Sequence, residues 1–416
     1  MKELAWSLPT GTEVNTLEEE KRKGLYIDWY LIVSIVLLAL FGLVMVYSAS
    51  YVQGYQVYDN MTYFFDRQLQ WLVISAVMFT FFMFFPYRHF RKLVPWIVFG
   101  SFALLLLILV PGVGYEVNGS MRWINVGPIR IQPSEFVKVG SIIYLAYVYS
   151  RKQAYINKFF TGVMPPLIIV LGFFILIMFQ PDLGTATSIV LVAGLLAFCS
   201  GARMLHIISL SSLAAWALYH YAQSAPYRLN RLLGYRNPFE LEQTEGFQLV
   251  QSYIAIAHGG LSGAGLGQSV QKLFYLPEAH TDFILAIVSE ELGLIGIAVV
   301  FLLMLAIIGR GVIIGTRCRD AFGSLLAFGI VFQLSIQMIF NAGAVNGLLP
   351  ITGIPFPFIS YGGSSLLVNF IAMGILANIS RRTEKERQEG LEKNEALPLE
   401  ENEEIQVGRP HVTVVK

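Results

Sequence analysis

Asp282 is the last polar residue before a long apolar segment, within the stretch PEAHTDF at 277–283. The pKa of a carboxyl group beside low-dielectric lipid can be raised, which suits a general base. The same position fits a helix N-cap, because Thr281 or Asp282 directly precedes the apolar run. Nearby His280 has no second His or Cys at a metal-ligand spacing, so no zinc site is predicted. Position alone favours the N-cap over the general base for Asp282.

Glu135 and Lys138 are a second pair of candidates, at the start of another apolar segment. Their i, i+3 spacing places them on one helical face, where they can pair. One interpretation is an interfacial ion pair whose lysine reaches the lipid headgroups. The other is a cationic contact for a phosphate, with Glu135 holding the lysine in place. Ionisable groups within a membrane are costly and pairing makes them tolerable, which favours the interfacial ion pair.

Three further carboxylates lie at or inside apolar segments. Asp182 follows a proline in the stretch QPDLGT at 180–185, where it can cap the next helix or belong to a site. Glu290 and Glu291 lie two turns into a span, and adjacent residues point in different directions on a helix. A buried structural pair is the favoured interpretation, with Lys138 or an arginine as a candidate partner for one of them.

Two segments rich in glycine or proline interrupt the apolar pattern. The stretch GGLSGAGLG at 259–267 could form an anion-binding nest of backbone N–H groups or a flexible hinge. It matches neither a Walker A loop nor GxGxxG. The stretch 349–365 has three prolines and three glycines at membrane depth. Non-helical backbone there is tolerated only against protein or a watery cavity, which predicts a re-entrant loop lining a site.

The composition shows what must position these residues. Of 416 residues, 55% are hydrophobic and 14% are charged, against roughly 25% charged in soluble proteins. The chain is therefore predicted to be an all-α polytopic membrane protein. Composition, the net charge of +1 and two distant cysteines (Cys199 and Cys318) exclude a soluble enzyme, a nucleic-acid binder and a disulfide scaffold.

A spanning helix needs about 20 apolar residues, and ten segments qualify as candidates. Two of them, 136–150 and 186–200, are short, so nine spans with one re-entrant segment is the alternative. The ten candidates are 29–48, 68–85, 93–110, 136–150, 163–180, 186–200, 204–223, 283–309, 321–340 and 365–380.

Basic residues set the predicted orientation. With both termini inside, most of the 29 Lys and Arg residues fall on the cytoplasmic side, which also favours an even number of spans. We expect a cytoplasmic segment at 1–28 without a cleavable signal peptide, a transmembrane domain at 29–380 and a disordered cytoplasmic tail at 381–416. The polar loops 112–135, 224–282 and 341–364 then face outward. The long middle loop, between spans seven and eight, is too long for a simple connector.

Seven short stretches together resemble the SEDS (shape, elongation, division and sporulation) family. They occur in the family's order and cover about 29–382. The stretches LPEAHTDF and YGGSS look more like the cell-division (FtsW-like) branch than the rod-shape (RodA-like) branch, and a sporulation paralogue is a further alternative. The seven are 122–124 (RWI), 131–138 (IQPSEFVK), 180–185 (QPDLGT), 226–228 (PYR), 275–283 (YLPEAHTDF), 290–293 (EELG) and 359–365 (ISYGGSS).

The resemblance implies a peptidoglycan glycosyltransferase that polymerises lipid II at the outer face of the cytoplasmic membrane. The family's essential aspartate corresponds to Asp282, which makes it the expected general base, and the family's functional pair corresponds to Glu135 and Lys138. The undecaprenyl diphosphate leaving group needs positive charge more than an acid. Lys138, Arg231 and a bound divalent cation (Mg²⁺ or Mn²⁺) are candidates for it, and no organic cofactor is expected.

Ser360 is a further candidate for contact with the substrate. Asp182, Glu290 and Glu291 are expected to shape the cavity or to balance its charge. Backside attack would convert an α-linked donor into a β-linked polymer.

The resemblance also implies partners and a place of action. These are a class B penicillin-binding protein as transpeptidase, other membrane proteins of the division machinery, and the division septum. Two alternatives of other classes stay open. A lipid II flippase would need a polar path across the whole bilayer, and a scaffold that only recruits the transpeptidase would not need so many intramembrane charges.

Overall fold

A computed structural model describes residues 26–117, 120–127, 129–153, 156–209, 212, 216 and 234–407. Ten α-helices dominate this part of the chain, with a π-helical turn at Phe159–Val163 and a 3₁₀ turn at Tyr87–His89. The α-helices are α2 (Trp29–Tyr58), α3 (Tyr63–Phe84), α4 (Phe90–Ile108), α5 (Pro133–Lys152), α6 (Met164–Phe179), α7 (Leu183–Cys199), α10 (Phe247–Gly259), α11 (Ile284–Arg317), α12 (Ala321–Val345) and α13 (Gly363–Val407).

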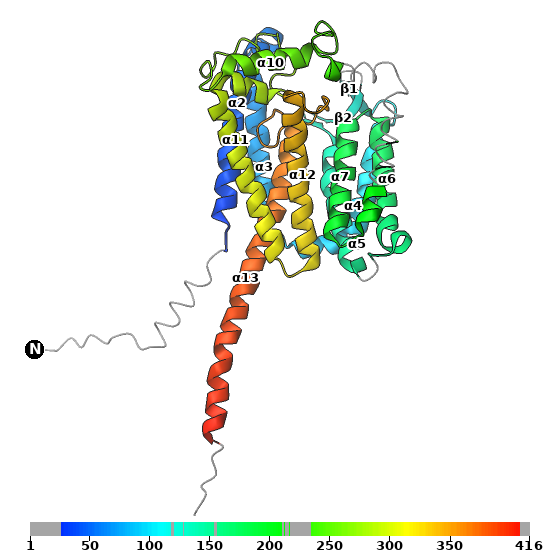
Figure 1. Ribbon diagram of the computed structural model, residues 1–416, viewed down its shortest axis with the longest axis vertical. Helices are drawn as coiled ribbons and strands as arrows, with labels where there is room; N and C mark the ends of the chain where they lie inside the picture. Colours follow the sequence, from blue (N-terminus) through cyan, green and yellow to red (C-terminus); the bar gives the residue numbers. More distant parts are fainter. Residues whose placement is uncertain are drawn as a thin grey trace, which may run out of the picture. The chain divides into compact units, whose positions relative to one another are not determined.

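The predicted membrane spans are largely present as helices. Within the described ranges, seven helical segments are long and apolar enough to cross a bilayer. Helix α7, with 17 residues, and the more polar α5, with 20, correspond to the two short predicted spans. Most of the predicted span 204–223 lies outside the described residues. The helices of residues 29–379 pack into one bundle (Figure 1).

Helix α13 continues to Val407 instead of ending near residue 380, where the tail was expected to begin. Charged pairs one turn apart favour a helix in this polar sequence. Arg387 lies 3.5 Å from Glu384, and Lys385 lies 3.6 Å from Glu389. The segment predicted as disordered is thus helical through Val407.

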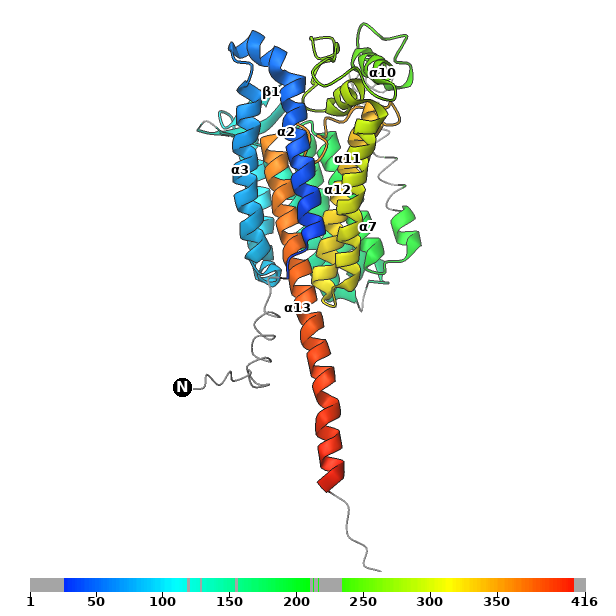
Figure 2. The same cartoon turned by 90° about the vertical axis from the view of Figure 1, so that its left-hand side faces the viewer.

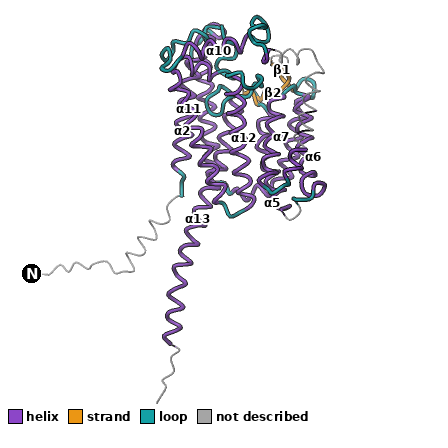
Figure 3. Tube along the Cα trace, viewed as in Figure 1, coloured by secondary structure: helices purple, strands orange, loops and turns teal. Residues whose placement is uncertain are grey.

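A small antiparallel sheet departs from the all-α prediction. Its strands are β1 (Gly114–Val117), β2 (Ser120–Val126) and β3 (Ile129–Ile131), in the order β1-β2-β3. The hairpins need only short turns, and a turn of positive φ at Gly127 follows β2. In Figure 3 the strands lie at the end of the bundle that also carries α10, which Figure 2 shows from the side.

Helix α11 is broken at Gly293, where φ is 64° and ψ is −160°. A positive φ favours glycine, and a break leaves backbone groups without helical partners. The glycine-rich loop before α11 supplies those partners, because the amides of Ala264 and Gly265 donate to the carbonyl oxygens of Glu290 and Glu291, at 2.9 Å each. These two amides of the predicted anion nest are therefore used within the fold.

Gly263→Ala is expected to destabilise the protein. Gly263 has a φ of +78°, and an added Cβ would overlap with the carbonyl of Glu291. The thermal unfolding midpoint of the full chain should fall by several degrees. Gly194→Ala is the matched control, because a Cβ there meets open space on helix α7. Equal midpoints for the two variants would contradict this account of the loop.

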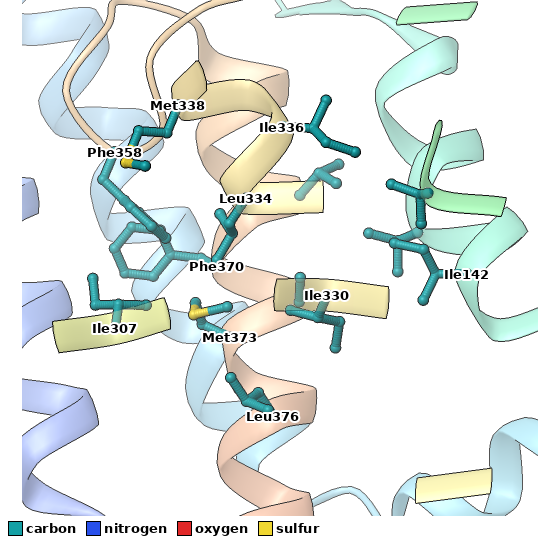
Figure 4. Close-up of a cluster of buried hydrophobic side chains, with 14 of the residues drawn as sticks. Ile142, Ile307, Ile330, Leu334, Ile336, Met338, Phe358, Phe370, Met373 and Leu376 are labelled. Atoms are coloured by element: carbon teal, nitrogen blue, oxygen red, sulfur yellow. The ribbon is translucent and has the colours of Figure 1, made fainter. Parts of the chain in front are cut away.

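The apolar core holds the predicted re-entrant segment in place. Residues 346–362 contain no regular helix, and Phe356 and Phe358 are buried in the bundle. Figure 4 shows Phe358 beside Phe370 of α13, and their ring centroids are 5.6 Å apart. The side-chain amide of Asn341 donates to the carbonyl oxygen of Ile354 at 2.9 Å. This segment is thereby fixed as a wall between α12 and α13.

Candidate active site

A cavity of about 1610 Å³ lies where the three polar loops meet. The sheet, the segment before α11 and the segment after α12 each contribute to its wall, as expected from the positions of these loops in the sequence. Helix α3 contributes another wall. The polar and charged residues that line the cavity include Asn60, Asp66, Arg67, Gln70, Arg122, Asn125, Arg130, Gln132, Glu245, Glu278, Thr281, Asp282, Thr352 and Ser365.

Asp282 lies in this cavity, one residue before the N-cap of α11. That N-cap is Phe283, without a side-chain capping bond, so the carboxyl group does not cap the helix. Asn341 fixes the backbone of Asp282 by donating to its carbonyl oxygen at 2.8 Å. No described residue donates a hydrogen bond to the carboxylate itself. The carboxylate is therefore held in position with its oxygens free to accept.

Burial raises the pKa of Asp282 to about 7, and the negative charges of Glu278 and Asp182 raise it further while Arg122 opposes them. A carboxylate with a pKa near neutrality is a competent general base at physiological pH. Burial also lowers the pKa of His280 to about 4, so this histidine is neutral at pH 7. The His280 ring packs behind the cavity against Phe64 and Tyr361, which line it, and His280 itself does not line the cavity.

Three arginines line the cavity, and the sequence had not singled them out as site residues. Arg122, in β2, donates to the carbonyl oxygens of Gln180 (at 3.1 Å) and Pro181. Arg67 and Arg130 each lie over a tyrosine ring, at 4.8 and 4.7 Å from its centroid. Guanidinium groups are well suited to bind phosphates. Arg122 belongs to the stretch RWI at 122–124, but only the fold shows that the three arginines share one cavity.

The predicted pair Glu135–Lys138 forms as an ion pair, with the ammonium 2.8 Å from the carboxylate. Both residues are only 2% exposed and neither lines the cavity, because they lie deeper along α5. Asp182 caps α7, since its carboxylate accepts from the amide of Thr185 at 3.1 Å. It also lies 4.0 Å from Arg122, so it contributes to the charge of the wall.

Glu290 and Glu291 are fully buried and fasten the long loop to α11. Glu290 accepts from the amide of Val270 at 2.9 Å and contacts His258 at 3.0 Å. Glu291 pairs with Lys272 at 2.6 Å, a buried cation that carries no signal in the sequence. Its partner is thus neither Lys138 nor an arginine.

The two remaining candidates are placed differently. The Ser360 hydroxyl donates to the carbonyl oxygen of Thr281 at 2.6 Å and accepts from the amide of Phe356 at 2.8 Å. Ser360 therefore ties the re-entrant segment to the segment that carries Asp282, and it does not line the cavity. Arg231 lies outside the described residues.

A resident divalent cation would need a set of oxygen or nitrogen ligands. Within the described part of the chain, no group of three or more His, Cys, Asp or Glu side chains could hold a metal ion. The carboxylates that line the cavity, Asp66, Glu245, Glu278 and Asp282, come from several different segments of the chain. The described residues do not form a dedicated metal site, and the mechanism below uses no metal.

Residues 28–385 match a family model described as cell cycle protein, which comprises FtsW, RodA and SpoVE. The chain belongs to this family, as the seven stretches predicted. It is 45% identical over 354 residues to stage V sporulation protein E of Bacillus subtilis, covering 85% of this chain and 97% of the relative. It is 42% identical over 355 residues to a Geobacter metallireducens protein named "Probable peptidoglycan glycosyltransferase FtsW", covering 85% and 95%.

Two solved structures share the fold. A chain of the structure described as "Structural coordination of polymerization and crosslinking by a peptidoglycan synthase complex" gives a TM-score of 0.72 at 24% identity, covering 86% of this chain and 99% of that one. The rod shape determining protein RodA of Thermus thermophilus gives 0.63 at 24% identity, covering 85% and 97%. The identities are low, so these likenesses concern the fold alone.

Proposed function

We propose that this membrane protein, a peptidoglycan glycosyltransferase by its family, polymerises lipid II into glycan strands at the outer face of the cytoplasmic membrane. The observation that carries the proposal is the carboxylate of Asp282, fixed by its backbone in a large cavity that three arginines also line. The curated relatives named as peptidoglycan glycosyltransferases support the reaction class.

In the proposed mechanism, the Asp282 carboxylate takes the proton of the acceptor sugar hydroxyl as that oxygen attacks the anomeric carbon of the donor. The new glycosidic bond forms as the bond from the anomeric carbon to the diphosphate oxygen breaks. Attack from the opposite face inverts the anomeric centre from α to β. Undecaprenyl diphosphate leaves with the electron pair, and the proton passes from Asp282 to solvent.

The departing diphosphate needs positive charge, because its charge grows as the bond breaks. We assign this role to Arg67, Arg122 and Arg130, which line the cavity with Asp282. Lys138 does not line the cavity, and its ammonium group pairs with Glu135 on the same helix. This assignment moves the cationic role from the predicted lysine to the arginines.

The proposed setting follows from the same family. We propose that both termini lie in the cytoplasm, that the end of the bundle with the cavity faces outward, and that a class B penicillin-binding protein is the transpeptidase partner. The related synthase complex coordinates polymerization with crosslinking, which supports such a partner. Action at the septum is proposed from the FtsW relatives, while the SpoVE relative makes sporulation the second candidate setting.

The test is a reconstitution of the full chain with lipid II, with and without a class B penicillin-binding protein. Glycan strands on a gel are the expected product. Transfer of lipid II across liposome membranes without polymer would favour a flippase, and a protein that only recruits the transpeptidase would give neither product. Either outcome would overturn the proposal.

The pH profile of polymerisation should report the pKa of Asp282 and the effect of Arg122 on that pKa. A base must be deprotonated to act, so kcat/KM should fall as the pH drops below about 7. Because Arg122 holds the pKa of Asp282 down, Arg122→Gln should move this acidic limb to higher pH. Arg130→Gln is the matched control, expected to raise KM without moving the limb, since Arg130 is not among the charges that shift Asp282. An unmoved limb in Arg122→Gln would contradict the assignment.

A further inference from the structure

Several buried side-chain polar atoms on three neighbouring helices have no hydrogen-bond partner among the described residues. The unpartnered atoms on α12 are both amide atoms of Gln333, both of Gln337 and Oδ1 of Asn341. Opposing them are Glu135 Oε2 on α5 and Asn369 Nδ2 on α13. All five residues are buried. Buried polar groups in a membrane bundle are costly unless they are hydrogen-bonded, so this concentration needs a physical account.

The register of the helices brings these groups to one depth. Gly329 of α12 packs directly against Ile142 of α5, and the two helices run in opposite directions. Gln333 is four residues beyond Gly329 on α12, and Lys138 is four residues before Ile142 on α5. Because both helices rise about 1.5 Å per residue, Gln333 and Lys138 lie at the same level. Figure 4 shows the same juxtaposition, with Ile336 of α12 pointing toward the helix that carries Ile142.

Helices α5 and α13 run in the same direction and begin side by side. The Ser364 hydroxyl accepts from the amide of Gln132 at 3.0 Å, which fixes their register. Asn369 is five residues beyond Ser364, and Lys138 is six residues beyond Gln132. Asn369 therefore lies at the depth of Lys138, on the third helix around the same point.

The hydrogen-bonding capacities of these groups are complementary. Lys138 has three N–H donors and uses one on Glu135 Oε1, while Glu135 Oε2 is an acceptor without a donor. The glutamines bring both amide donors and carbonyl acceptors, and Asn369 brings a donor. None of them makes a direct hydrogen bond to the pair. A bound water can bridge buried polar groups that do not touch.

We propose that Gln333, Gln337 and Asn369 are positioning residues for the Glu135–Lys138 ion pair, linked to it by bound water in a buried polar layer beneath the cavity. Asn341 extends this layer upward, since it follows Gln337 by one turn and holds the backbone of Asp282. Through Asn341, the layer thus fixes the position of the Asp282 backbone in the cavity. Its link to catalysis rests on the proposed function, whereas its hydrogen bonding does not.

The first test is a thermodynamic cycle on the full chain in nanodiscs. Gln337→Met keeps the side-chain length and removes the hydrogen bonds. We expect it to lower the thermal unfolding midpoint in the wild-type background, and to leave the midpoint unchanged or raise it when Glu135→Gln and Lys138→Met have removed the charges.

Ser335→Ala is the control on α12, since its hydroxyl bonds only within the helix, to the carbonyl oxygen of Val331. It should shift the midpoint equally in both backgrounds. Equal shifts for Gln337→Met would overturn the proposal.

The second test needs no variant, so folding cannot obscure it. A cryo-EM map of the wild-type chain at a resolution that shows water should contain density between Glu135 Oε2 and the amides of Gln333 or Gln337. A dry, closely packed apolar contact at that place would overturn the proposal.

An activity measurement separates positioning from substrate binding. Gln337→Met should lower kcat about tenfold or more at unchanged KM, because misplacing the base affects the chemical step. Gln337→Glu, which keeps the side-chain length and its acceptor oxygen, should restore part of the rate. An unchanged kcat, or a loss confined to KM, would overturn the positioning role. A wild-type chain that makes no polymer would refute the proposed function, while the first two tests would still decide whether the layer exists.

Discussion

Replacing Asp282 with asparagine is expected to lower the rate of lipid II polymerisation by about 10²- to 10⁴-fold, the usual contribution of a general base. Asparagine has nearly the same shape, but its amide cannot accept the proton of the acceptor hydroxyl. The backbone bond from Asn341 should persist, so the site should keep its geometry. Polymer formed by the purified full chain from lipid II is the measurement.

The stability of this variant provides the control. The raised pKa means that, between about pH 4 and 7, the folded protein binds a proton at Asp282 that the unfolded chain has released. The stability contributed by that proton is lost as the pH rises through about 7. Asp282→Asn, which carries no charge at any pH, should therefore unfold no earlier than wild type at pH 8. Glu278→Gln should retain polymerisation, with its acidic limb moved to lower pH. An active Asp282→Asn protein would exclude Asp282 as the base.

The second large effect is expected at the other buried carboxylate–cation pair. Lys272→Met should destabilise the fold by about 3–5 kcal/mol, because it leaves the carboxylate of Glu291 buried without its cation. Hydrogen bonds from the Ser48 hydroxyl, at 2.6 and 2.8 Å, would remain but cannot neutralise the charge. The measurement is chemical unfolding of the full chain in mixed micelles.

The double variant Lys272→Met with Glu291→Gln is the informative comparison. It removes both charges, and an apolar or neutral replacement of a buried ion pair often costs little. We expect it to recover most of the stability lost by Lys272→Met alone. If the double variant is as unstable as the sum of its single changes, the ion pair is not what holds the long loop to α11.

Much of the fold follows from local composition, and the exceptions have physical causes. Long apolar runs define a helix such as α2 almost without competition, because the backbone must bond internally in lipid. The sheet was missed because β1 and β3 are only four and three residues long, and their pairing depends on non-local contacts. The extension of α13 was missed because this segment is rich in charged residues and has little hydrophobic patterning, a composition that is typical of disorder.

The site divides in a similar way. Asp282 was found because an acidic residue at the edge of a span is conspicuous and because its stretch resembles a family. Its cap interpretation failed because α11 begins one residue further on, without a side-chain capping bond. Arg67 and Lys272 carried no local signal, since an arginine or a lysine in a polar segment is ordinary until the fold brings it to a cavity or buries it.

The α3 wall of the cavity begins with Tyr63, Phe64 and Asp66 and continues with Arg67, Gln70, Trp71 and Ile74. From Arg67 to Ile74, over two helical turns or about 10 Å, the side chains change from a guanidinium through an amide and an indole to an alkyl group. Such a wall matches the boundary between the polar and the apolar part of a lipid-like molecule. An amphiphile sliding along it comes to rest where its own boundary between charge and hydrocarbon matches the boundary on the helix. For the proposed lipid II substrate, this wall would then favour molecules whose diphosphate lies at the depth of Arg67 in the bilayer.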